Sequence, residues 1–229
     1  MTGSVDIGSM GEAARWIAGP AQLIALGFMA AVYAVKIALA LRRTPMRDRA
    51  PARGSEAGGA IYALATLAMP WELDSLRRRP LRYAEFVMLH VGVATAIAAS
   101  FVLPYAPSIL SSRIAAIAAQ CAIGIGLLAA LVRLGRRALV PHVRAITSIG
   151  DVVPLVALIS WLGSAIWAVA AGSEAGVLTF MSLTAILIVY VPFSKISHYV
   201  LWPFVRVAMG SHFGRRGVYP VRRGRPHGR

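Results

Sequence analysis

The chain contains about five apolar segments, each long enough to cross the hydrocarbon core of a membrane as a helix. A transmembrane helix needs about 20 consecutive, mainly apolar residues. Hydrophobic residues make up 58% of the 229 residues and charged ones only 14%, which is too apolar for a soluble domain of this length. We therefore predict an all-α membrane protein, a bundle of about five transmembrane helices. The expected spans are residues 16–41, 83–102, 114–132, 152–171 and 177–202.

Two other stretches, residues 59–71 and residues 1–11, are not expected to change the number of spans. Residues 59–71 are apolar but too short to cross a bilayer, so we expect an interfacial or re-entrant segment there. Residues 1–11 lack the basic region that begins a signal peptide. The first apolar segment is therefore expected to be retained as a transmembrane helix.

The arginines cluster in alternate connections between the apolar segments and give the chain a formal net charge of +15. Loop 42–82 and the connection after residue 132 are rich in arginine, whereas 104–112 and 171–176 contain no lysine or arginine. The positive-inside rule assigns the basic connections to the cytoplasm. We therefore expect an N-terminus outside and a cytoplasmic C-terminus, with topology rather than nucleic-acid binding explaining the charge.

The expected organisation is a transmembrane domain over residues 1–205, with 42–82 as its cytoplasmic loop, and a basic cytoplasmic tail over 206–229. Glycine and proline interrupt the tail, so we expect it to be extended. Both an anchor on anionic lipid and a docking strip for an acidic partner fit its composition.

Two histidines lie in apolar segments: His90 is a few residues into the second, and His198 is near the end of the fifth. Titratable side chains are costly inside a membrane. The expected topology places both imidazoles in the cytoplasmic half of the bilayer, which predicts a shared metal or cofactor, with haem b as the leading interpretation. Either histidine alone would be expected to donate a hydrogen bond between helices. The remaining histidines, His142, His212 and His227, are expected to be solvated or interfacial.

Two motifs lie at the ends of the third and fifth segments. Residues 136–145 read R-R-A-L-V-P-H-V-R-A, followed by Thr147 and Asp151, and residues 192–195 read P-F-S-K, followed by His198. The first resembles an R-R-x-x-x-P-x-V-R-A loop, and the second is similar to a P-F-S-[KR]-x-x-H ending. Both belong to the cytochrome b membrane subunit family typified by the gamma subunit of respiratory nitrate reductase, with related subunits in the Hdr and Dsr complexes.

The resemblance implies that His90 and His198 are the axial ligands of a haem b on the cytoplasmic side. The family's usual second, outer haem has ligands at two positions that hold Ser100 and Phe180 here. Neither residue ligates haem iron in the ordinary way. We therefore expect one haem per chain, with the outer haem absent.

Charged residues near the expected haem have predicted partners. Haem propionates prefer the polar edge of a membrane and cationic donors, so we expect them to face Arg82, Lys195 or Arg144. Glu85 precedes His90 on the same segment. We expect Glu85 to pair with an arginine rather than to carry a proton to a quinone.

The expected function is electron transfer between the membrane quinone pool and a cytoplasmic iron–sulfur subunit, in a multi-pass protein of the inner (cytoplasmic) cell membrane. The only cysteine is Cys121, and no C-x-x-C pair is present, so an iron–sulfur cluster has to come from a partner. The chain is then an electron-transfer subunit of an oxidoreductase complex rather than an enzyme alone. With one inner haem, quinone chemistry should lie near the membrane middle or the inner face. A haem-free membrane anchor and a small transporter are the alternatives.

Overall fold

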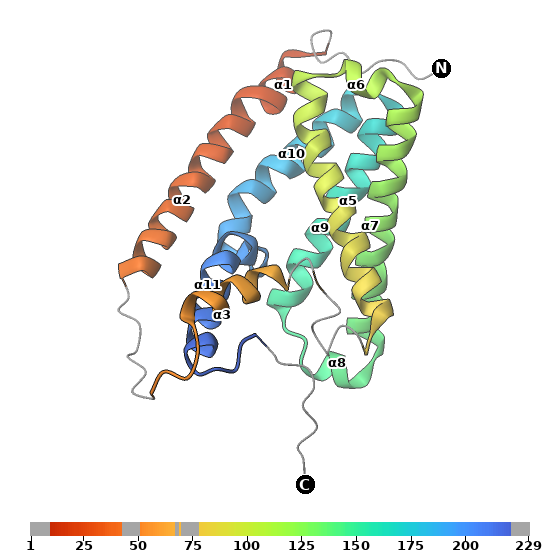
Figure 1. The fold of residues 1–229 in the computed structure, drawn as a ribbon. Coiled ribbons are helices and arrows are strands. Elements are labelled where there is room, and N and C mark those ends of the chain that lie inside the picture. Colours follow the sequence, from red (N-terminus) through yellow and green to blue (C-terminus); the bar gives the residue numbers. More distant parts are fainter. Residues whose placement is uncertain (1–9, 43–50, 67–68, 70–77, 221–229) are drawn as a thin grey trace. The chain divides into compact units, whose positions relative to one another are not determined.

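The computed structural model describes residues 10–42, 51–66, 69 and 78–220, and within these ranges the regular structure is entirely helical (Figure 1). Five of the described helices are long and apolar enough to cross a membrane. Their bounds are Glu12–Arg42, Pro80–Tyr105, Arg113–Leu139, Ile149–Ala171 and Glu174–Phe193. The predicted fold class is confirmed: the chain is an all-α, multi-pass membrane protein.

The chain divides into two compact units. The first takes in Met1–Tyr33 and Leu81–Ile196, and the second takes in Ala34–Pro80 and Ser197–Arg229. The predicted boundary between residues 205 and 206 lies inside helix α11 (His198–Arg215). The first ten residues of the expected extended tail are therefore helical, whereas 221–229 lie outside the described residues.

Four long helices form the body of the first unit: α5 (Pro80–Tyr105), α7 (Arg113–Leu139), α9 (Ile149–Ala171) and α10 (Glu174–Tyr190). They lie side by side in Figure 1, joined by connections that contain the short helices α6 (Ser108–Ser111) and α8 (Pro141–Ala145). Short connections make consecutive helices antiparallel. The fully buried side chains are mostly small or aliphatic: Ala96, Leu103, Ile123, Ala130, Leu162, Ala165, Ala168, Val177, Phe180 and Met181.

Helices α5 and α7 cross at a pair of glycines. A Cβ built on Gly92 would lie 2.6 Å from the Cα of Gly126, and one built on Gly126 would lie 2.7 Å from the Cα of Gly92. Real Cβ atoms do not come this close to another backbone, so both positions require glycine at this separation. In a bilayer, where no hydrophobic force drives helices together, such close van der Waals packing stabilises the pair.

The first span begins with α1 (Glu12–Trp16) and a π-helical turn, η2 (Ile17–Ala21), and continues as α2 (Gln22–Arg42). Pro20 lies inside the π turn; it lacks an N–H group and so cannot complete a regular α-helical ladder. The buried amide of Gln22 donates to the carbonyl of Met181 at 2.6 Å. This hydrogen bond joins the beginning of α2 to the middle of α10.

The second unit is a helix pair made of α3 (Glu56–Ala65) and α11. A Cβ on Gly59 would overlap the backbone at Gly210 and Gly214, and a Cβ on Gly214 would lie 2.7 Å from the Cα of Gly59. Gly210 and Gly214 form a G-x-x-x-G repeat, which lets helices approach closely. Helix α3 has only ten residues and is not among the candidate spans, consistent with an interfacial or re-entrant segment.

The expectation of one continuous fifth span over residues 177–202 is wrong. Helix α10 ends at Tyr190, and two 3₁₀ turns, η4 (Val191–Phe193) and η5 (Lys195–Ser197), precede α11. Between these turns Ser194 has an extended backbone, with φ −101° and ψ 171°. Its hydroxyl accepts a hydrogen bond from the Ile196 N–H at 3.1 Å and so caps the second turn. Hydropathy does not reveal this break because apolar residues lie on both sides of it.

The glycine crossing can be tested by comparing Gly126→Val with Gly124→Val on the same helix. A Cβ at Gly126 meets the α5 backbone, whereas a Cβ at Gly124 has nothing within 4 Å. Gly126→Val should lower the free energy of unfolding by roughly 1–3 kcal/mol, the usual cost of overpacking, with little change for Gly124→Val. Denaturant unfolding of the detergent-solubilised protein, followed by circular dichroism, measures both. Equal stability of the two variants would contradict the crossing.

Candidate functional site

His90 is exposed on α5, and its ring is held by its own helix. Its Nδ1 lies 2.7 Å from the carbonyl oxygen of Phe86, one turn earlier, and the two rings pack with centroids 4.0 Å apart. A carbonyl oxygen only accepts hydrogen bonds, so Nδ1 carries the proton and donates. In the neutral imidazole the lone pair is then on Nε2. Metal-ligating histidines commonly show this arrangement, in which the other ring nitrogen donates to a backbone carbonyl.

The small residues that follow His90 on α5 divide between two faces of the helix. Gly92, Ala96 and Ala99 are buried against the neighbouring helices. Ala94 and Ala98 are exposed, one and two turns beyond His90 on its own side. The first set serves helix packing, whereas the second places only small side chains on the exposed face that carries the imidazole.

His198 is the first residue of α11 and belongs to the second unit, whereas His90 belongs to the first. The expectation that His198 lies on the fifth span is wrong, because that span ends at Phe193. The pairing of the two histidines on one haem stays a prediction. In the described parts of the chain, no group of three or more His, Cys, Asp and Glu side chains could hold a metal ion; a bis-histidine haem needs only two.

The two positions that the family uses for a second haem are part of the packed core. The Ser100 hydroxyl donates to the Ile97 carbonyl at 2.7 Å. Phe180 is fully buried and packs on Trp161, with ring centroids 5.8 Å apart. These contacts give both side chains a structural role, and a single haem remains the prediction.

Glu85 pairs with two arginines, as predicted. Its Oε2 lies 2.6 Å from a terminal guanidinium nitrogen of Arg136, and its Oε1 lies 3.0 Å from Nε of Arg133 and 3.2 Å from the other terminal nitrogen of Arg136. The Glu85 side chain is only 9% exposed. A carboxylate so poorly solvated needs charged partners, and these join the beginning of α5 to the end of α7.

Asp151 brings together the two motifs found in the sequence. Its carboxylate lies 2.7 Å from the Lys195 ammonium, which comes from P-F-S-K, and 3.8 Å from the Arg137 guanidinium, which comes from the arginine motif. Asp151 also accepts hydrogen bonds from the backbone and hydroxyl of Ser148, the N-cap of α9. Lys195, predicted to face a propionate, is therefore paired with a carboxylate of its own chain.

The other two predicted propionate partners are exposed. Arg82 lies in the first turn of α5 and lines a groove with Glu85 and Arg136, and Arg144 lies on α8. Arg82 thus lines a groove with members of the Glu85 cluster, which consists of Glu85, Arg133 and Arg136. Lys195 belongs to the Asp151 cluster, which consists of Asp151, Arg137 and Lys195. Both clusters lie at the same end of the four-helix bundle, because α5 and α9 begin there and α7 ends there. This end carries the excess of arginine on which the predicted orientation depends.

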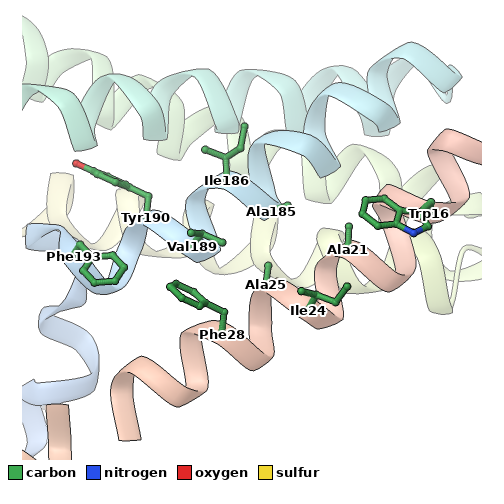
Figure 2. A pocket seen from close by; sticks show the side chains of 10 residues that line it. All are labelled: Trp16, Ala21, Ile24, Ala25, Phe28, Ala185, Ile186, Val189, Tyr190 and Phe193. Atoms are coloured by element: carbon green, nitrogen blue, oxygen red, sulfur yellow. The ribbon is translucent and has the colours of Figure 1, made fainter. Parts of the chain in front are cut away.

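A second feature, missed by sequence reasoning, is an apolar groove of 750 Å³ in the first unit, between the beginning of the first span and the end of α10. Figure 2 shows Phe28 and Val189 facing each other across it. The rings of Phe28 and Phe193 are 6.2 Å apart. The groove is lined by Trp16, Ala21, Ile24, Ala25, Phe28, Ala185, Ile186, Val189, Tyr190 and Phe193. No sequence signal distinguishes these residues from ordinary lipid-facing ones.

Comparison with known proteins adds no relative to these observations. No protein-family model, curated protein or solved structure matches the chain significantly. The family resemblance therefore depends on the two motifs that meet at Asp151 and on the two histidines.

Proposed function

We propose that the protein is the membrane subunit of a redox complex, binds one haem b through His90 and His198, and transfers electrons between membrane quinone and an iron–sulfur partner. The observation that carries the proposal is the hydrogen bond from His90 Nδ1 to the Phe86 carbonyl. A histidine whose role was to join helices would direct this bond to a neighbouring helix. Here the bond stays within α5 and leaves Nε2 as the ligating atom beside Ala94 and Ala98.

Other observations support the second ligand and the propionate partners. His198 is supported by its place in the P-F-S-K-x-x-H motif. Arg144 and Arg82 are exposed cations that could pair with propionates, while Lys195 would share its charge with Asp151. A bound bis-histidine haem supplies reversible one-electron transfer. The chain's own contribution is to fix the ligand ring and to provide countercharge.

The quinone is proposed to bind in the groove between α2 and α10. Quinones have flat apolar rings and long isoprenoid tails, and the groove offers the aromatic side chains of Trp16, Phe28 and Phe193. Its volume of 750 Å³ lies within the usual range for small-molecule sites, about 300–1,000 Å³. Two members of this lining carry polar groups that could bond a quinone oxygen: Trp16 has an indole N–H, which donates, and Tyr190 has a phenol.

The partner and the cellular location follow from charge and cysteine content. The arginine-rich end that holds Glu85 and Asp151 is proposed to face the cytoplasm, in the inner cell membrane. A cytoplasmic iron–sulfur subunit would dock there, since one cysteine cannot hold such a cluster. The alternative, a haem-free anchor of a redox complex, would need both ionic clusters but not the orientation of His90.

Removing either proposed ligand tests the haem. Purified wild-type protein, expressed with adequate haem, should contain about one haem b per chain, as expected for a bis-histidine site. His90→Ala and His198→Ala should each lose most of it, because a bis-histidine haem needs both bonds. Reduced-minus-oxidised spectra with pyridine haemochrome quantification measure the content. His142→Ala, on α8, is the matched control and should keep its haem. Properly inserted wild-type protein without haem would favour the anchor.

The quinone groove can be tested without haem, because quinones quench tryptophan fluorescence and Trp16 lines the groove. Decylubiquinone should quench the wild-type protein saturably, and Trp16→Phe should remove most of the saturable component. Val189→Phe should weaken binding by about tenfold or more, as expected when a close-packed ring occupies the site. Val156→Phe is the control, because Val156 is on α9 and as exposed as Val189, 43% against 42%. Linear quenching, equal in all variants, would exclude the groove.

A further inference from the structure

A second groove, of 330 Å³, follows the contact between α5 and α7. It combines two kinds of lining. Leu81, Met88, Leu128, Ala129 and Val132 are apolar, whereas Arg82, Glu85 and Arg136 are charged. The charged members come from the beginning of α5 and the end of α7, so the groove has a polar part at that end of the bundle and an apolar part that continues along the helices.

The polar part carries an excess of positive charge. Both carboxylate oxygens of Glu85 are already bonded to Arg133 and Arg136. Arg82 lines the same groove. The three guanidinium groups of Arg82, Arg133 and Arg136 therefore accompany one carboxylate at this end, a net charge of about +2. Each guanidinium has five N–H donors, and the Glu85 bonds use one of Arg133 and two of Arg136. Donors therefore remain for a further anion.

The apolar part is open to the surroundings of the bundle. Leu128 is 61% exposed and Val132 is 52% exposed. In a span that crosses a bilayer, such side chains contact lipid tails. A molecule in this groove therefore meets guanidinium donors at one end and hydrocarbon along the rest. A phospholipid with a charged headgroup has the matching arrangement, because its phosphate is at one end and its acyl chains extend from it.

We propose that this groove binds one anionic phospholipid, whose phosphate bonds to Arg82 and Arg136 and whose acyl chain lies along Leu128 and Val132. The site is separate from the proposed haem ligand: His90 follows Glu85 by five residues and lies roughly 140° around α5 from it. This proposal gives Arg82 to the lipid in place of a haem propionate, so Arg144 and Lys195 remain as the proposed propionate partners. It does not depend on haem, since lipid retention can be measured in protein that lacks it.

Native mass spectrometry of the purified full chain in detergent tests the proposal, with dioleoylphosphatidylglycerol and dioleoylphosphatidylcholine supplied at equal concentration. Wild-type protein should retain one phosphatidylglycerol in preference to phosphatidylcholine. Arg82→Gln should reduce this preference about fivefold, the effect expected for one arginine near a membrane surface. Arg113→Gln is the matched control, because it makes the same charge change at the other end of α7 and should leave the preference unaltered.

A second variant, Leu128→Trp, tests the apolar part. It fills the groove from an exposed position, so it should lower retention of phosphatidylglycerol while circular dichroism shows an unchanged fold. Equal retention of the two lipids by wild-type protein would overturn the proposal, as would an unchanged preference in Arg82→Gln. Displacement of the lipid by inorganic phosphate at equal concentration would show a site for an ion alone, and would likewise overturn it.

Discussion

The ion pairs at one end of the bundle are the interaction on which the rest of the first unit depends. Glu85 joins α5 to α7, and Asp151 joins α9 both to α7, through Arg137, and to the turn after α10, through Lys195. Apolar side chains gain nothing by leaving lipid for a helix interface, so directional contacts and close backbone packing determine the arrangement. The glycine crossing at Gly92 and Gly126 complements these pairs from within the bilayer region.

The parts of the fold that sequence reasoning predicted are those that depend on residue type alone. Long apolar runs locate five spans, and a carboxylate such as Glu85 beside arginine-rich connections predicts an ion pair. The break at Ser194 was missed, because it depends on a local hydrogen bond and an extended backbone rather than on hydropathy. The helical form of residues 206–215 was missed for a related reason: packing against α3 outweighs the glycines that suggest an extended chain.

The candidate site, too, has features that the sequence predicts and features that only the structure shows. Residue type and position identify His90, but only coordinates show that its Nδ1 bonds to Phe86 and that Ala94 and Ala98 share its exposed face. The charged residues of the two sequence motifs, unlike His90, have a structural role that needs no cofactor. Arg136, Arg137 and Lys195 bind carboxylates of their own chain, so a fold of this kind would retain them with or without a cofactor. The histidines, rather than the motif cations, are therefore the residues that favour haem.

The glycine contact between α3 and α11 has a consequence for biogenesis. The two helices are far apart in the chain: Glu56 and Arg215, which form an ion pair between them, are separated by 159 residues. At about 5–20 residues per second, the ribosome needs roughly 8 to 32 s to make that interval. During this time the glycine face of α3 has no partner from α11, so the α3–α11 pair can form only after all of the spans between the two helices have been made.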